Sequence, residues 1–340
     1  MQTETEKPTI DLKHIFSSSL FESAKSSLDI IKIMIPISFL MELLNNFGLL
    51  NILSDIAKPI SGLLGLPGEA ILAIITGYVI SCYPAIAIIT TLSLTIKQIT
   101  IIGAMLVICH TLSVEIPIQK KIGGKQLNIL LIRIISSLLV GMLLNLILKD
   151  NSELITGTSI LPISHGWAGF LKYFALKNII VLQIIILNFV ILFTYRLLEA
   201  LNVLALLATL LSPLMKIFGL PKDLTFLWLI TNTAGLIYGS NLILSELKNS
   251  KIKARDLVKL NYSLATCHAI IQESAIFAVI GASIPALVAP RVLLAIGILF
   301  VINLREKVVI SRKNVRLTAK QNTSFQSALE AWIKSKRRRS

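Results

Sequence analysis

Two short strings in this sequence place a cysteine, a histidine and a glutamate at one spacing. The first runs from Cys109-His110 to Glu115, and the second runs from Cys267-His268 to Glu273. Both strings lie in strongly apolar surroundings, where ionisable side chains are costly and by default indicate function. Imidazole and carboxylate groups can bind a polar solute, carry protons or coordinate a metal.

The spacing predicts a break in the helix that carries each pair. We expect spans at 98–119 and 256–279, with His110 and His268 near the bilayer midplane. Each glutamate follows its histidine by five residues, which is about 7 Å along a helix axis and a rotation of about 140°. Histidine and glutamate can therefore share a face only where the helix is unwound between them.

Two other interpretations of these residues stay open. Each pair could be a buried polar lock between helices, with neutral side chains bonded to backbone. Cys109 and Cys267 could instead join His110 and His268 as metal ligands, although adjacent cysteine and histidine are not a standard chelating spacing.

Composition predicts an all-α polytopic membrane protein. Of 340 residues, 54% are hydrophobic and 15% are charged, and mean hydropathy is +0.79, which is more apolar side chain than a soluble core could bury. Apolar stretches of about 20 residues, the length of a membrane span, recur from Ile30 to Leu304. No glycine-rich nucleotide loop or ordered catalytic triad is present, so we expect no enzyme and no cofactor.

The chain repeats itself. The spacing from Pro59 to Gly65-Leu66-Pro67 returns from Pro213 to Gly219-Leu220-Pro221 at an offset of 154, and the Cys-His-Glu string returns at 158. Each copy reads as one span (30–50; 174–197), an amphipathic piece, an interrupted segment and two further spans.

The interrupted segments, 70–94 and 224–244, hold glycine, proline and polar residues that weaken a continuous lipid-facing helix. We predict re-entrant hairpins or broken helices there. The expected breaks are Gly77, Pro84, Gly235 and Gly239. The expected solute contacts, beside the two His-Glu pairs, are Ser81, Tyr83, Asn232, Thr233, Tyr238 and Gln272.

Charge predicts that the two repeats are inverted. If both chain ends are cytoplasmic, the inside segments without the tail hold 13 lysines and arginines, and the outside segments, counted with Arg291, hold 6, as the positive-inside rule requires. Three more, Arg133 among them, fall within spans. Reading the interrupted segments as full crossings gives parallel repeats instead. The predicted boundaries are a cytoplasmic segment 1–27, repeats at 28–149 and 174–304, an external loop 150–173 and a basic cytoplasmic tail 305–340.

The sequence resembles the bacterial nucleoside recognition, or Gate domain, family. The resemblance rests on Gly65-Leu66-Pro67-Gly68-Glu69-Ala70, on the hairpin with Tyr83, and on Ile108-Cys109-His110 to Val114-Glu115 with Lys120-Lys121. It implies two Gate units over 28–304, similar to membrane parts of concentrative nucleoside transporters, of the ferrous iron transporter B and of spore maturation proteins A and B.

The expected function is secondary transport or gating of a small polar solute, such as a nucleoside, or an ion across the bacterial cytoplasmic (inner) membrane, with proton or sodium coupling. The alternatives are a membrane scaffold or regulatory subunit, and a divalent metal permease component. The net charge of +15 lies in loops and tail, so we expect anionic lipid at the tail rather than nucleic acid. A homodimer or a partner subunit is also expected.

Overall fold

The computed structural model describes residues 12–149, 178–248 and 252–306, and throughout these ranges the chain forms helices and connecting turns without a strand. The expected external loop 150–173, the first eleven residues and the tail beyond Glu306 lie outside the described residues. The predictions made for them therefore stay predictions.

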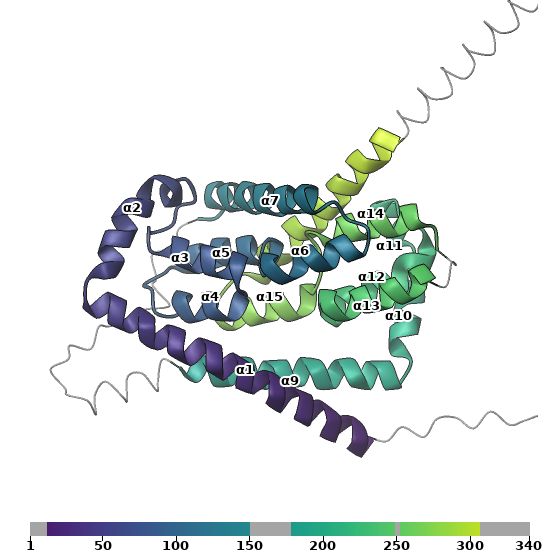
Figure 1. The fold of residues 1–340 in the computed structure, drawn as a ribbon, viewed down its shortest axis with the longest axis horizontal. Coiled ribbons are helices and arrows are strands. Elements are labelled where there is room, and N and C mark those ends of the chain that lie inside the picture. Colours follow the sequence, from purple (N-terminus) through teal and green to yellow (C-terminus); the bar gives the residue numbers. More distant parts are fainter. Residues whose placement is uncertain (1–11, 150–177, 249–251, 307–340) are drawn as a thin grey trace, which may run out of the picture.

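The helices of the two halves follow one another in the same order (Figure 1). The first half consists of α1 (Leu12–Asn46), α2 (Leu49–Leu63), α3 (Ala70–Val79), α4 (Cys82–Ile89), α5 (Ile96–Ile108), α6 (Leu112–Lys121) and α7 (Gln126–Ile147). The second consists of α9 (Ile179–Ala200), α10 (Val203–Leu211), α11 (Leu214–Phe218), the short 3-10 turn η2 (Lys222–Leu224), α12 (Thr225–Thr233), α13 (Gly235–Lys248), α14 (Ala254–Leu264), α15 (Ile270–Val279) and a last helix, Ile284–Glu306.

Four stretches of the described residues are long and apolar enough to cross a membrane. They are Ile96–Lys121, which contains a break, Gln126–Ile147, Ile179–Ala200 and Ile284–Glu306. The predicted first span, 30–50, is not among them, and the helix that covers most of it, α1, begins at Leu12 and ends at Asn46. Gly48 follows with φ +70°, a left-handed conformation that glycine adopts without strain, so the chain turns into α2 there.

The interrupted segments are helical hairpins. α3 and α4 contain 10 and 8 residues, so they are about 15 and 12 Å long, half of a bilayer core of about 30 Å. α3 packs along α4, and in the second half α12 packs along α13. The first hairpin turns at Ile80–Ser81 and the second at Ala234–Gly235.

Of the four expected break positions, Gly235 alone lies at a turn, with φ +85°. Gly77 and Gly239 lie inside helices, where each leaves room for a neighbour: a Cβ on Gly77 would overlap Leu106, and one on Gly239 would lie 2.8 Å from Thr231 Cβ. Pro84 lies in the first turn of α4, where its missing N–H leaves no helical hydrogen bond unmade. These three predictions of a break are wrong.

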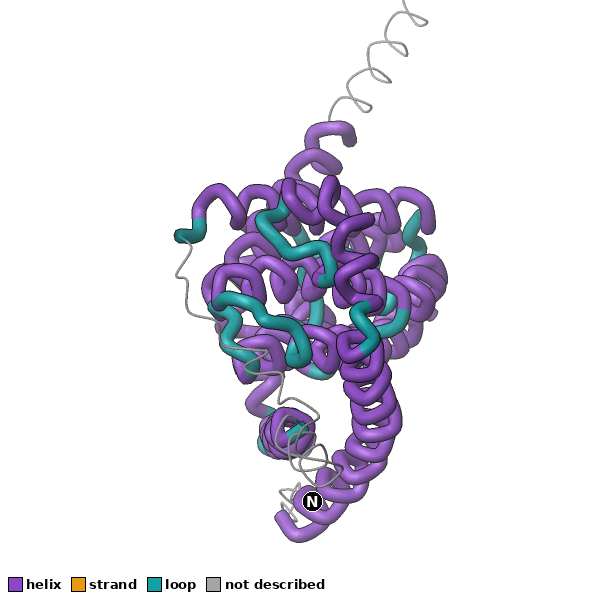
Figure 2. The backbone as a smooth tube through the Cα atoms, turned by 90° about the vertical axis from the view of Figure 1, so that its left-hand side faces the viewer, coloured by secondary structure: helices purple, strands orange, loops and turns teal. Residues whose placement is uncertain are grey.

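The long helices run along a common direction, and the amphipathic helices cross them at the two ends. In Figure 1, α2 lies at the left end and α10 and α11 lie at the right end. Figure 2 shows α1 extending beyond the main body of helices toward the N-terminal end of the chain, and α1 packs against both α9 and α4. The hairpin α3–α4 therefore has α1 on one side and α5 on the other.

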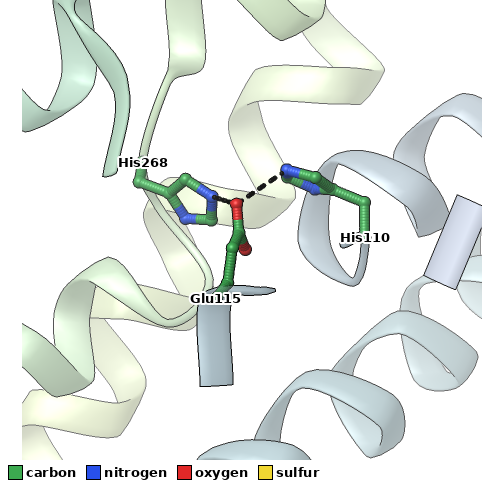
Figure 3. A group of neighbouring side chains, drawn as sticks. All are labelled: His110, Glu115 and His268. Atoms are coloured by element: carbon green, nitrogen blue, oxygen red, sulfur yellow. Dashed lines mark hydrogen bonds and ion pairs between the residues drawn. The ribbon is translucent and has the colours of Figure 1, made fainter. Parts of the chain in front are cut away.

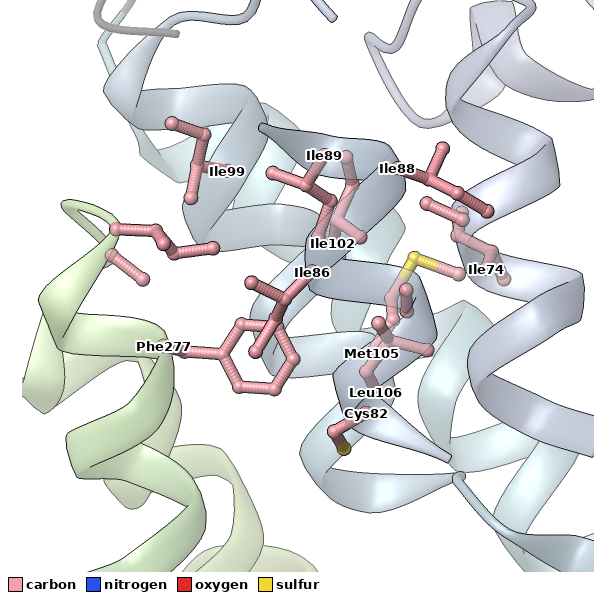
Figure 4. Close-up of a cluster of buried hydrophobic side chains, with 14 of the residues drawn as sticks. Ile74, Cys82, Ile86, Ile88, Ile89, Ile99, Ile102, Met105, Leu106 and Phe277 are labelled. Atoms are coloured by element: carbon pink, nitrogen blue, oxygen red, sulfur yellow. The ribbon is translucent and has the colours of Figure 1, made fainter. Parts of the chain in front are cut away.

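A hydrophobic core fills the space between the first hairpin, α5 and α15. Ile86 of α4, Ile102 and Met105 of α5, and Phe277 of α15 have no exposed surface (Figure 4). Between helices in lipid, such side chains stabilise the fold through van der Waals packing rather than through removal from water. This core joins residues of both repeats and so fixes where the breaks of the two halves meet.

Candidate functional site

Two unwound segments meet in the middle of the molecule. In the first half α5 ends at Ile108 and α6 begins at Leu112, and in the second α14 ends at Leu264 and α15 begins at Ile270. Thr111 (φ 48°) and Ala269 (φ 46°) hold the left-handed conformation that starts the next helix. The structure therefore has the break expected between each histidine and its glutamate.

Each break is tied to its hairpin by a backbone hydrogen bond. Thr111 N donates to Gly77 O over 3.0 Å, and Ala269 N donates to Thr231 O over 3.1 Å. An N–H at a helix start has no partner within its helix, so these bonds satisfy groups that the breaks expose. The hairpin tips are thereby held beside the unwound segments.

The histidines and glutamates of both repeats form one cluster, which we call the His-Glu cluster: His110, His268, Glu115 and Glu273. His110 Nε2 lies 3.1 Å from Glu115 Oε1 and 2.9 Å from Glu273 Oε1. His268 Nε2 lies 3.2 Å from Glu115 Oε1 and 3.8 Å from Glu273 Oε1. Figure 3 shows Glu115 reaching between the two imidazole rings, and all four side chains are buried.

The other nitrogen of each imidazole is engaged by the backbone. His110 Nδ1 lies 2.9 Å from Leu106 O, and His268 Nδ1 lies 2.7 Å from Leu264 O. A carbonyl oxygen can only accept, so each Nδ1 carries the hydrogen. In a neutral imidazole Nε2 is then an acceptor, directed at the carboxylates.

Arg133 of α7 stabilises the first break by bonding its backbone carbonyls and the glutamate that follows. Its Nε donates to Ile108 O over 3.1 Å and its Nη2 donates to His110 O over 3.0 Å, and it also bonds Glu115. The side chain has no exposed surface. It thus satisfies carbonyls at the end of α5 and neutralises the carboxylate in the first turn of α6.

Arg291 of the last helix does the same in the second half. Its Nε donates to Thr266 O over 3.1 Å, and its Nη2 bonds His268 O and, over 2.9 Å, Glu273. This side chain is also fully buried. Both glutamates therefore present one oxygen to an arginine and the other to the histidines.

The two arginines were not among the predicted site residues. Arg291 was assigned to an outside segment, and this assignment is wrong because Arg291 lies within the apolar helix Ile284–Glu306 and its side chain reaches the central site. Arg133 was placed within a span, and it lies in α7. A signal was available in the sequence, since Arg133 and Arg291 are 158 residues apart, the offset that relates the two Cys-His-Glu strings. Without Arg291, the number of lysines and arginines in the predicted outside segments falls from 6 to 5.

A cavity of about 270 Å³ adjoins the His-Glu cluster between the hairpin tips. The predicted residues Ser81, Tyr83 and Gln272 line this cavity together with the cluster. The rest of its lining is Cys82, Thr111, Val114, Ala234, Gly235, Leu236, Ile237, Ala269 and Ile276.

The structure does not bring Asn232, Thr233 or Tyr238 to this cavity. Asn232 donates its amide to Trp228 O over 3.0 Å, and Thr233 donates its hydroxyl to Leu229 O over 2.9 Å, the backbone bonding that such side chains make within a helix. Thr233 and Tyr238 line a separate cavity of about 170 Å³ beside α9. Gln272 lines both cavities.

The cysteines are not part of the cluster. Among the described residues, the group with metal-ligand spacing is His110, Glu115 and His268, whose ligand atoms lie within 4.8 Å of one another. Cys267 packs instead in a hydrophobic cluster with α14, and Cys109 is buried with no exposed surface. Neither sulfur atom of the metal set proposed from the sequence therefore belongs to the group with metal-ligand spacing.

Known proteins that resemble this chain are membrane proteins. Residues 27–126 match the family model Gate, described as nucleoside recognition. Residues 27–126 therefore resemble a Gate domain. Over 291 residues it is 27% identical to the "Uncharacterized membrane protein YvoD" of Bacillus subtilis (strain 168), an alignment that covers 84% of this chain and 93% of that protein. No solved structure matches.

The matched Gate range covers most of the first repeat, and it includes His110 and Glu115 but not Arg133. Together with its apolar helices, these findings indicate a membrane protein in which residues 27–126 are similar to the Gate family. The second repeat lies outside the matched range, so a second Gate unit at 174–304 stays a prediction.

Proposed function

We propose that this protein is a membrane transporter that carries a small polar solute through the cavity between its two hairpin tips. The observation that carries the proposal is the convergence of two helical hairpins and two broken helices on one buried polar site. Irregular backbone at membrane depth is tolerated where it is buried in protein or lines a water-filled cavity. Transporters place their sites at such helix ends.

The cavity suits a small solute. Its volume of about 270 Å³ is near the lower limit of small-molecule sites, about 300 Å³. Its lining offers the hydroxyls of Ser81 and Tyr83, the amide of Gln272 and the His-Glu cluster, which can pair with hydroxyl and amide groups of a solute. Nucleosides carry such groups, and the Gate description makes them the first solutes to test.

We further propose that the repeats are inverted, as alternating access in many carriers requires. α2 and its counterpart, α10 with α11, lie at opposite ends of the molecule (Figure 1). The turn after α6 and the first half of α14 lie on the same side, since a Cβ on Gly123 would contact Val258 at 3.0 Å. With this side in the bacterial cytoplasm, the charge distribution agrees with the positive-inside rule.

The test is uptake of labelled nucleosides by proteoliposomes that contain the purified chain, with an imposed proton or sodium gradient. Uptake should exceed that of empty liposomes and should be lost in the double variant His110→Gln/His268→Gln. His14→Gln is the matched control, because His14 is an exposed residue of α1, and it should leave uptake unchanged.

Uptake that the double variant leaves intact would place the solute path elsewhere. Absence of flux for every solute tested, with a partner protein recovered at fixed stoichiometry, would instead favour a membrane scaffold or regulatory subunit.

A further inference from the structure

The four atoms that face one another in the His-Glu cluster are all acceptors when the imidazoles are neutral. Each Nδ1 hydrogen is directed at a backbone carbonyl, so neither Nε2 has a hydrogen to offer to Glu115 or Glu273. Acceptors at 2.9 to 3.8 Å repel unless a positive charge lies between them. The geometry therefore calls for protons or for a cation.

We propose that His110, His268, Glu115 and Glu273 bind one divalent transition-metal ion, of which Zn²⁺ is the representative. The ion would contact Nε2 of both histidines and Oε1 of both glutamates. This metal-site proposal does not depend on solute transport by the protein, and so it goes beyond the proposed function.

The distances fit a tetrahedral ion. With metal–ligand bonds of about 2.0–2.2 Å, the ligand atoms of a tetrahedron lie about 3.3–3.6 Å apart. The four measured Nε2–Oε1 distances are 2.9, 3.1, 3.2 and 3.8 Å. His110, Glu115 and His268 already have metal-ligand spacing, and Glu273 lies outside that group, so it would complete the coordination by moving toward His268.

The surroundings of the ligands fit as well. Histidines that bind metals donate their second nitrogen to a carbonyl or carboxylate, which fixes the tautomer. Both histidines do so here, to Leu106 and Leu264. Arg133 and Arg291 hold the far oxygens of the glutamates, so each carboxylate is directed with one oxygen toward the ion.

Charge and donor type select the class of ion. The charges of the two arginines and the two glutamates sum to zero. A divalent ion therefore adds the same charge as two protons, one on each histidine Nε2, would add. Two imidazole nitrogens favour zinc and its first-row neighbours over Mg²⁺ and Ca²⁺, which prefer oxygen ligands alone. A tetrahedral set of two nitrogens and two oxygens is suited to Zn²⁺ and Co²⁺.

The experiment titrates the untagged, detergent-purified full chain with Zn²⁺ after chelation, by calorimetry, and with Co²⁺, by absorption. One ion should bind per chain. Bound Co²⁺ should show the intense visible bands of a tetrahedral site and no thiolate charge-transfer band in the near ultraviolet. His268→Gln should weaken Zn²⁺ binding by about 100-fold or more, since loss of an outer partner alone weakens binding 10- to 100-fold.

Two controls isolate the site. His14→Gln removes a histidine outside the cluster, and Cys109→Ser/Cys267→Ser removes the two sulfurs, so both variants should bind Zn²⁺ as the unchanged chain does. A thiolate band, or Zn²⁺ binding retained by His110→Gln/His268→Gln, would overturn the donor set. Absence of stoichiometric binding by the unchanged, folded chain would overturn the site, whatever the uptake assay gives.

Discussion

At the scale of single residues, the site depends on two arginines that lie inside the membrane part. Arg133 and Arg291 each bond the carbonyls of a broken helix and the glutamate that follows it. Helix ends leave carbonyls without partners, and a break in the bilayer core has little water to supply them. The arginines therefore stabilise a backbone shape that the His-Glu cluster requires.

Loss of one arginine should leave a buried carboxylate without its counter-charge. Arg133→Met should lower the free energy of unfolding by about 3–5 kcal/mol, the usual effect of breaking a buried pair. Adding Glu115→Gln should restore part of that loss, because no charge is then left alone. Denaturation of each variant in detergent, followed by circular dichroism, measures the cycle, and additive losses would show that the two residues do not act as a pair.

At the scale of elements, the hairpins fix the breaks through close backbone approach. Gly239 of α13 lies against Thr231 of α12, and Thr231 O accepts the bond from Ala269 N at the second break. Packing of α12 on α13 is thus linked to the position of His268 by a single hydrogen bond.

Gly239→Ala should separate α12 from α13, because the new Cβ would lie 2.8 Å from Thr231 Cβ and 3.0 Å from Thr231 Cα. We expect a loss of about 1–3 kcal/mol in the free energy of unfolding, typical of overpacking. Gly297→Ala is the matched control, with no atom within 4 Å of its Cβ, and it should gain up to about 1 kcal/mol. Equal effects on thermal unfolding would refute the close approach.

Glycine at a left-handed position of a break should raise the free energy of unfolding, whereas Gly239→Ala should lower it. Ala269 (φ 46°) is strained, by about 1–2 kcal/mol for a residue with a Cβ, and glycine removes that strain. Ala269→Gly should raise the free energy of unfolding by about 0.5–1 kcal/mol, after the greater freedom of glycine in the unfolded chain is subtracted. Ala275→Gly, inside α15, should lower it by about 1 kcal/mol; the same sign for both variants would contradict the break.

At the scale of the whole molecule, the order of elements repeats, and the proposed inversion sets the direction of each repeat in the membrane. Among the described residues, the amphipathic helices of the two repeats lie at opposite ends (Figure 1). The three cysteines are buried, so a thiol introduced at the surface can be labelled over a low background.

Inverted repeats place corresponding surface positions on opposite sides of the membrane. Lys58→Cys on α2 should react with a membrane-impermeant thiol reagent in intact cells, and Lys216→Cys on α11 should react only after permeabilisation. Both positions are exposed. The unchanged chain is the control, and labelling of both variants from one side would establish parallel repeats.

The sequence by itself determined the helical membrane class, the repeated order of elements, the hairpins and the break between each histidine and its glutamate. Composition, self-similarity and the 3.6-residue period are local properties, and they sufficed for these features. The period alone required a break, since five residues place His110 and Glu115 on different faces.

Tertiary structure alone decided which atoms meet. Glu115 lies between the histidines of both repeats, a contact across 153 residues of chain that no local pattern encodes. The side chains of Asn232 and Thr233 instead donate hydrogen bonds to backbone carbonyls one turn earlier in their own helix. Arg133 and Arg291 became part of the site because helices distant in sequence pack over the breaks, and lipid leaves a buried charge no partner but another residue.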